Sequence, residues 1–195
     1  MPASMPPLAI RLATPDDGAA VADIYAPVVR DTATSFEMVP PDADEMAARI
    51  AHTLPRYPYL VAEEAGVVVG YAYAGAFRAR AAYAWTAETS VYLAPAAQGR
   101  GVGRRLMEAL LDVLSAQGFA MVYASATVPN EASIGLHRAL GFADVGVFPR
   151  AGFKFGRWHD TWWGALDLGA GAAPVPTLAL SDLGADRLAS LLAAR

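Results

Sequence analysis

The stretch with the clearest chemical meaning in this sequence is rich in glycine. Residues 98–103 read Gln-Gly-Arg-Gly-Val-Gly and lead directly into a segment with Leu106 and Leu110 at helical spacing. Small residues let main-chain amides approach a phosphate, and the positive end of the helix dipole favours an anion. The stretch therefore predicts a phosphate-binding loop, with a simple tight turn between a strand and a helix as the alternative.

Two common nucleotide-binding loops do not fit this stretch. A Walker loop needs Gly-Lys followed by Ser or Thr, which is absent, and Arg104 stands where the dinucleotide pattern needs its third glycine. The ligand expected here is therefore a phosphate-bearing molecule of another kind.

A carboxylate precedes the loop on a predicted strand. Residues 85–93 alternate, so that Glu88 lies on the more polar face and Ala87 on the more apolar one. Glu88 is therefore a candidate proton acceptor, although a single strand carboxylate is more often structural.

Composition narrows the chemistry further. The chain has no cysteine, which excludes a cysteine nucleophile and thiolate metal ligands, and its three histidines lack the short spacing of a metal site. The formal charge of −4 gives no reason to expect a nucleic-acid partner. Neither a secretory signal nor a transmembrane segment is recognisable, so we expect a cytoplasmic protein without membrane contact.

The remaining elements must position the loop and the carboxylate. We expect strands at 8–13, 59–63, 67–77, 85–93, 119–127, 142–148 and 158–168, and helices at 15–30, 42–54, 104–118 and 130–140. Early hairpin pairing and a late strand-helix-strand crossover predict an α/β (α+β) fold, in which about four helices flank a mixed, mostly antiparallel sheet of about seven strands. We expect one domain over residues 8–168, and an Ala/Pro-rich tail over 169–195 that forms a mobile linker with a short helix around 183–194.

Two motifs resemble the Gcn5-related N-acetyltransferase (GNAT) superfamily. Gln98, Gly101 and Gly103 match its Q/R-x-x-G-x-G/A segment, and residues 130–142 look like its N-x-x-x-x-x-L-Y/H-x-x-L-G-F segment. The resemblance implies acetyl-coenzyme A as co-substrate, no metal, and a sheet splayed between the fourth and fifth strands. It implies the following cofactor-binding residues: Val91, Tyr92, Leu93, Gln98, Gly99, Arg100, Gly101, Val102, Gly103, Arg104, Asn130 and Ser133.

Further stretches resemble the branch that acetylates phosphinothricin and methionine sulfoximine. They are residues 56–58, 79–86 and 152–160, together with a Thr-x-Glu-x-x-Val-Tyr signature that begins at Thr86. The resemblance implies transfer of an acetyl group to the α-amino group of a small amino acid, including methionine sulfone, with Glu88 as general base. An ordinary Glu is a weak base for an amine, so burial or a relaying water must assist it.

The sequence does not identify the general acid that would protonate the departing coenzyme A thiolate. His137 stands where many superfamily members carry a tyrosine in this role, and a histidine packed for structural reasons is the alternative.

Cations and aromatic residues are candidates for binding the acceptor. Arginine matches a carboxylate or phosphinate bidentately, although each cation could instead be a solvated surface charge. The candidate substrate-binding residues are Phe36, Arg78, Arg80, Ala81, Ala82, Tyr83, Glu88 and Lys154.

Two other functions stay open. One is a GNAT enzyme for another amine, such as an aminoglycoside, another amino acid or a protein N-terminus, and the other is a non-catalytic acetyl-coenzyme A-binding module. The resemblance also implies a homodimer, and a role in antibiotic or herbicide resistance or in metabolic detoxification.

Overall fold

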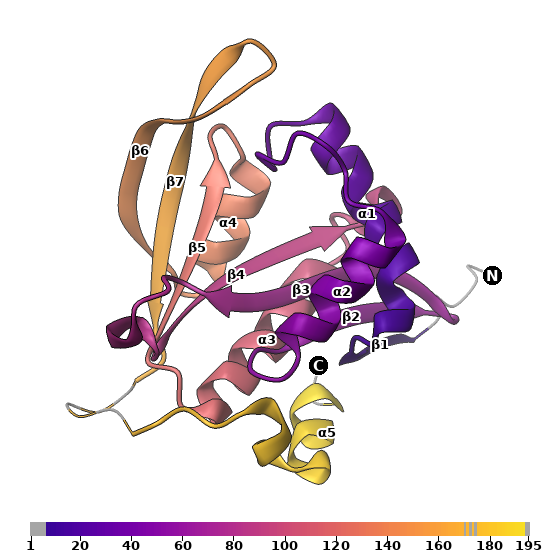
Figure 1. The fold of residues 1–195 in the computed structure, drawn as a ribbon, viewed down its shortest axis with the longest axis vertical. Helices are drawn as coiled ribbons and strands as arrows, with labels where there is room; N and C mark the ends of the chain where they lie inside the picture. The colour runs from indigo at the N-terminus through magenta and orange to yellow at the C-terminus, as the bar shows by residue number, and fades with distance from the viewer. Residues whose placement is uncertain (1–6, 170, 172, 174, 194–195) are drawn as a thin grey trace.

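The computed structural model describes residues 7–169, 171, 173 and 175–193, and Figure 1 shows their arrangement. The chain forms the following elements in order: β1 (Leu8–Leu12), η1 (Pro15–Asp17), α1 (Gly18–Asp31), α2 (Ala43–Thr53), β2 (Tyr59–Glu64), β3 (Val67–Ala76), η2 (Ala81–Tyr83), β4 (Thr86–Leu93), η3 (Pro95–Ala97), α3 (Val102–Gln117), β5 (Met121–Thr127), α4 (Glu131–Ala139), β6 (Ala143–Lys154), β7 (Arg157–Asp167), η4 (Leu180–Leu183) and α5 (Ala185–Ala193).

One seven-stranded sheet, in the order β1-β2-β3-β4-β5-β7-β6, runs through the molecule. Only β4 and β5 pair in parallel, while every other neighbouring pair is antiparallel. The predicted mixed, mostly antiparallel sheet is therefore confirmed.

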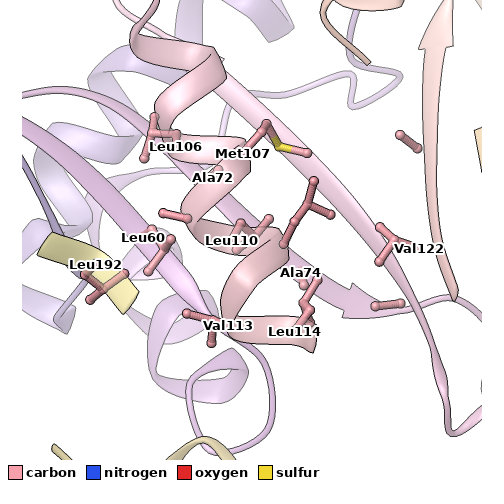
Figure 2. Close-up of a cluster of buried hydrophobic side chains, with 14 of the residues drawn as sticks. Leu60, Ala72, Ala74, Leu106, Met107, Leu110, Val113, Leu114, Val122 and Leu192 are labelled. Carbon is pink, nitrogen blue, oxygen red and sulfur yellow. The ribbon is translucent and has the colours of Figure 1, made fainter. Parts of the chain in front are cut away.

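The two faces of the sheet are covered by different helices. Tyr59 and Val61 of β2 pack with α1 and α2, whereas Leu60 and Ala62, which point the other way, pack with α3. Figure 2 shows the α3 side of this core, where Leu110 is fully buried. Strand alternation thus separates an α1/α2 face from an α3 face.

Side chains and glycine set the helix ends that the sequence predicted. The carboxylate of Asp42 accepts from Glu45 N at 2.9 Å at the start of α2, and Asn130 Oδ1 accepts from Ser133 N at 3.1 Å at the start of α4. Gly118 ends α3 with φ of 88°, a left-handed conformation that glycine adopts without strain.

The sixth strand is longer than the sequence predicted. It does not end at Phe148 but continues to Lys154, with a shift in its pairing to β7 between Phe148 and Gly152. The residues between Phe148 and Gly152 are thus an irregularity within a long hairpin, because β7 offers a partner on both sides of them.

The tail packs on the domain instead of extending away from it. Leu180, Leu183 and Leu192 are buried in the core that α3 shares with the sheet. The predicted short helix is present as α5, which ends at Ala193, while Ala194 lies outside the described residues. In the part of the chain that the structure describes, none of the helices has the length and apolar character needed to cross a membrane.

Candidate active site

A gap opens between β4 and β5. The two strands pair only over residues 86–89 and 121–124, and beyond these residues β4 pairs with β3 alone while β5 pairs with β7. Figure 1 shows β4 and β5 diverging. The predicted splay between the fourth and fifth strands is confirmed.

Main-chain groups of β4 face this gap. Ala94 N donates to Val69 O on β3, so by alternation Tyr92 also bonds toward β3, whereas Val91 and Leu93 direct their N–H and C=O groups toward the gap. The ring of Tyr92 packs 4.9 Å from that of Tyr25, on the α1/α2 face. Of the three β4 residues predicted to bind the cofactor, Val91 and Leu93 therefore have main-chain groups that face the gap, and Tyr92 does not.

The glycine loop lies where the gap ends. Gly99 and Gly101 have φ of 70° and 81°, and Gly101 is the N-cap of α3. The first helical bond runs from Arg105 N to Gly101 O, which leaves the N–H groups of residues 102–104 free of helical acceptors. A side chain at Gly103 would come within 3.3 Å of Leu93, so the missing side chain lets the helix start close to β4.

Two arginines of the loop are paired with carboxylates. Arg100 donates to Glu64 at 2.7 Å, and Arg104 donates to Glu108 at 2.9 Å, while the neighbouring Gln98 is exposed. The groups of this loop that are suited to an anion are therefore mainly its main-chain N–H groups, which lie at the positive end of the α3 dipole.

The start of α4 lies beyond the carboxyl end of β5. Asn130 Oδ1 serves as the cap for Ser133 N, which leaves the two N–H donors of its side-chain amide to serve a ligand. Ser133 uses its carbonyl to accept from His137.

Glu88 lies within the last paired residues before the gap, on the α1/α2 face. It is half-buried, and Ser125 Oγ donates to its Oε1 at 3.2 Å. Burial raises the pKa of Glu88, while the Ser125 hydrogen bond and the charge of Arg78 act in the opposite direction. The residue directly across on β3 is Gly75, where the space for a side chain is open. The position across from the carboxylate is therefore open.

Aromatic side chains form a wall next to Glu88. The rings of Phe77 and Tyr123 stack at 4.4 Å, and Trp163 meets Phe77 edge-on at 6.1 Å. The guanidinium of Arg78 lies 4.2 Å from the Phe77 ring centre. No local pattern in the sequence marks these three aromatic residues as neighbours, because they meet only across the assembled sheet.

The predicted substrate-binding residues fall into two groups. Arg78 is close enough to Glu88 to influence its pKa, and the ring of Tyr83 meets Phe77 at 5.8 Å. Arg80, Ala81 and Ala82 are exposed on the same connection between β3 and β4.

Lys154 and Phe36 belong to the second group, at the end of the long hairpin. Lys154 is buried and donates to Val29 O at 2.6 Å and Ser35 O at 2.7 Å. Phe36 packs over Gly152, where any side chain would come within 2.5 Å of its ring. The ammonium of Lys154 thus holds the loop that carries Phe36.

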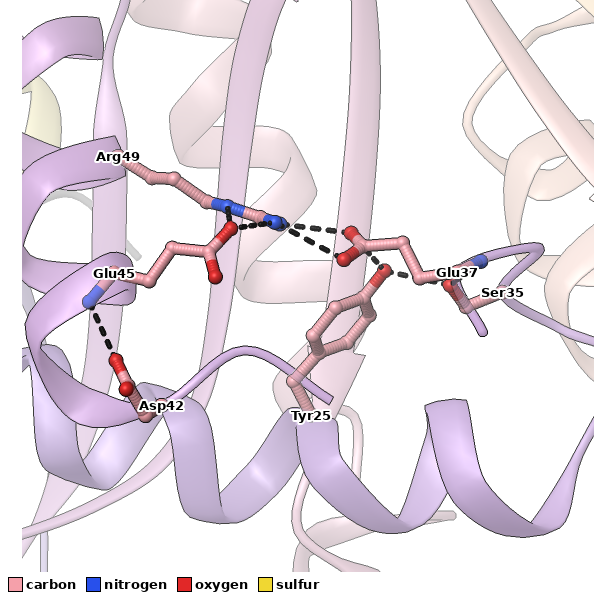
Figure 3. Close-up of polar contacts among 6 residues, drawn as sticks. All are labelled: Tyr25, Ser35, Glu37, Asp42, Glu45 and Arg49. Atoms are coloured by element: carbon pink, nitrogen blue, oxygen red, sulfur yellow. Dashed lines mark hydrogen bonds and ion pairs between the residues drawn. The ribbon is translucent and has the colours of Figure 1, made fainter. Parts of the chain in front are cut away.

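The same loop is held from its other side by a polar network (Figure 3). Tyr25 donates to Glu37 at 3.0 Å and shares a 2.7 Å hydrogen bond with Ser35, while Arg49 donates to both carboxylate oxygens of Glu37. Residues 32–41 are therefore fixed between α1, α2 and the hairpin.

His137 is buried on α4 against aromatic rings. Its Nδ1 lies 2.8 Å from Ser133 O, so Nδ1 carries the proton of the neutral ring. The ring packs 5.0 Å from Phe142 and 6.0 Å from Trp162, and burial lowers its pKa. A neutral ring in this tautomer has no proton at Nε2 to donate, which favours the structural alternative for His137.

No group of three or more histidine, aspartate or glutamate residues could hold a metal ion within the described ranges. The groups that this site offers to a ligand are the carboxylate of Glu88, the guanidinium of Arg78, the aromatic wall and the main-chain N–H groups of the glycine loop.

Comparison with known proteins agrees with this geometry. Residues 10–163 match a family described as Acetyltransferase (GNAT) domain. The chain is 46% identical over 169 residues to a phosphinothricin N-acetyltransferase of Alcaligenes faecalis, which covers 86% of each chain. It is 41% identical over 168 residues to an L-methionine sulfoximine/L-methionine sulfone acetyltransferase of Salmonella typhimurium, covering 86% of this chain and 98% of that protein. A crystal structure of a phosphinothricin acetyltransferase from Sinorhizobium meliloti in complex with acetyl-CoA superposes with a TM-score of 0.82, at 41% identity, and covers 87% of this chain and 93% of that one.

Proposed function

The chain belongs to the GNAT acetyltransferase family and is an N-acetyltransferase, and from this premise we propose that it transfers the acetyl group of acetyl-CoA to the α-amino group of a small amino acid. The proposed acceptors are phosphinothricin, methionine sulfoximine and methionine sulfone. One observation carries the proposal: the half-buried Glu88 lies at the point where β4 and β5 part, with open space beside it.

The residues around the gap fit acetyl-CoA, which would supply a reactive acetyl thioester when bound. Val91 and Leu93 offer main-chain hydrogen bonds to its pantetheine arm in the manner of an added strand. Main-chain N–H groups from Gly99 to Arg104 offer an anion site for its pyrophosphate, and Asn130 retains an amide donor. A solved relative from Salmonella typhimurium, with a TM-score of 0.82 at 41% identity, contains acetyl-CoA, which supports the same ligand here.

Glu88 acts as the general base in this proposal. An ammonium has no lone pair, so the acceptor must lose a proton before it attacks the thioester. Burial raises the pKa of Glu88 and thereby makes the carboxylate a better proton acceptor than an ordinary glutamate. Ser125 orients the carboxylate through its hydrogen bond.

Arg78 and the aromatic wall receive the rest of the acceptor. The guanidinium lies over the rings of Phe77 and Trp163, where it can pair with the carboxylate of an amino acid. Arg80, together with residues 81–83, lies on the same connection and completes the acceptor side. We assign Lys154 and Phe36 to shaping this side, because the ammonium of Lys154 is already bonded to two carbonyls.

A homodimer forms part of the proposal. The hairpin of β6 and β7 exposes several large apolar side chains, among them Val145, Phe153, Phe155 and Trp158. A patch of this kind usually marks an interface. Sedimentation velocity at several concentrations tests it, with a monomer at micromolar concentration as the outcome against it.

The experiment for the function is release of coenzyme A from acetyl-CoA with each of the three acceptors. The chain has no cysteine, so a thiol reagent detects only released coenzyme A. Efficient turnover of one or more acceptors is expected. Tight binding of acetyl-CoA without turnover of any of them would remove this acceptor class and direct the search to other amines.

A further inference from the structure

Residues 175–193, which we name the C-terminal strap, are bound to the domain at several points. Leu180, Leu183 and Leu192 are buried, and α5 lies against α3 and β1. In Figure 1 the strap, shown in yellow, runs beside the end of α3. It is therefore a fixed part of the fold.

The strap is attached to the connection that leads into β4. The indole Nε1 of Trp85 donates to Val175 O at 2.6 Å. Arg56 donates both to Ala84 O at 3.2 Å and to Thr177 Oγ1 at 3.3 Å. Two neighbouring residues of the connection are thus tied to the strap, one directly and one through Arg56.

A buried glutamine anchors the same region to α3. The Nε2 atom of Gln117 donates to Leu178 O at 3.0 Å and to Arg56 O at 2.8 Å, and Gln117 is 1% exposed. The strap, α3 and Arg56 therefore form one connected unit.

The connection that the strap holds is the proposed acceptor side. Residues 78–85 begin with Arg78 over the aromatic wall, include Tyr83 against Phe77, and end at Trp85, whose carbonyl accepts from Ala120 N at 2.8 Å. Glu88 follows three residues later on β4. A shift of Trp85 would therefore move the groups that orient the acceptor, but not the glycine loop.

The strap lies outside the family domain. The family match ends at residue 163, and 86% of this chain already accounts for 98% of the Salmonella typhimurium relative.

We propose that the C-terminal strap positions the acceptor side of the active site, with Trp85 as its positioning residue. The expected change in the KM for the acceptor rests on the proposed acetyl transfer. The expected loosening of residues 78–85 does not. The strap holds residues 78–85 in the arrangement that binds the acceptor, and its release lowers the fraction of molecules in that arrangement.

Two full-length variants test the proposal, one with a substitution in the connection and the other with a substitution in the strap. Trp85→Phe keeps an aromatic ring but removes the N–H donor to Val175, and Leu183→Ala loosens the strap far from the connection. Ile50→Ala is the matched control, since Ile50 is fully buried in the separate α1/α2 core.

Two readouts separate positioning from a general loss of stability. In both strap variants the KM for the acceptor rises by up to about fivefold, the factor that one hydrogen bond is worth, while the KM for acetyl-CoA is unchanged. Trypsin cleavage after the exposed Arg78 and Arg80, followed by mass spectrometry, accelerates in the same two variants. Ile50→Ala lowers the Tm without either change.

Equal cleavage rates in Trp85→Phe and the wild type would overturn the proposal, whatever the acceptor proves to be. An equal rise of acceptor KM and cleavage in Ile50→Ala would also overturn it. Failure of all three acceptors would instead count against the proposed function, because the cleavage readout needs no turnover.

Discussion

Replacement of Glu88 by glutamine tests the proposed chemistry with little structural change. Glutamine has the same shape, and its carbonyl oxygen can still accept from Ser125 Oγ, which lies 3.2 Å away in the wild type. It carries no charge and cannot take a proton. A positioned general base contributes about 10²- to 10⁴-fold, so kcat/KM should fall by that factor, or about 3–5 kcal/mol in activation free energy.

The same substitution should not destabilise the protein at neutral pH. Burial holds the pKa of Glu88 above its unfolded value, so the unfolded chain releases this proton first as the pH rises. Ionisation therefore lowers the free energy of unfolding across the interval between the two pKa values, and the full cost persists above it. Glu88→Gln removes this cost, so its Tm at pH 7 should equal or exceed that of the wild type and should match it at a pH below both values.

Coenzyme A release measured from pH 6 to 9, with Tm recorded in parallel, checks both expectations. The activity deficit of Glu88→Gln should narrow toward high pH, because solution then supplies more neutral amine. A deficit below about tenfold would refute the role of Glu88 as general base, given the usual contribution of such a residue. A large fall in Tm would show that the activity loss comes from damage to the fold.

Three other substitutions follow from the geometry. Gly101→Ala adds strain at a φ of 81° without a steric clash, so the Kd for acetyl-CoA should rise about 5- to 30-fold by calorimetry, and an unchanged Kd would contradict the role of this loop. Ser125→Ala removes a hydrogen bond that lowers the pKa of Glu88, so the acidic limb of the kcat/KM profile should move to higher pH, and movement the other way would count against this pairing. Lys154→Met leaves two carbonyls without their donor and should lower the free energy of unfolding, measured in urea, by about 2–4 kcal/mol. A stability equal to that of the wild type would show that these two hydrogen bonds do not stabilise the fold.

Local sequence patterns were sufficient for most elements and for the place of the glycine loop between a strand and a helix. Asp42, Asn130 and Gly118 mark helix ends through chemistry that depends on a few neighbouring residues. The glycine loop likewise follows a strand and opens a helix within a short stretch of chain. Signals of this kind are readable because the interacting groups are close in sequence.

The proposed acceptor side is formed by contacts that one sequence does not reveal. Phe77, Tyr123 and Trp163 meet because of the registers of β3 with β4, β4 with β5 and β5 with β7, and no local pattern specifies these registers. Lys154 could equally have bound a substrate or a carbonyl, and only the fold brings it to Val29.

The length of β6 and the packing of the tail against the domain could not be predicted either, because both depend on contacts with distant parts of the chain. The predicted strand ended at Phe148, but β7 pairs again with the chain from Gly152 onward. Residues 169–195 resemble a linker in composition, and the surface of α3 that buries Leu183 becomes visible only in three dimensions.

The two hydrogen bonds of the Lys154 ammonium also affect the order in which parts of the protein fold during synthesis. Lys154 bonds to carbonyls 125 and 119 residues earlier in the chain, and Thr127 donates to Ala33 O across 94 residues. A ribosome releases the N-terminal residues first, so α1 and the loop after it emerge long before their anchors. The loop that carries Phe36 gains these hydrogen bonds only after the last hairpin has left the ribosome, so the proposed acceptor side is among the last parts of the nascent protein to form.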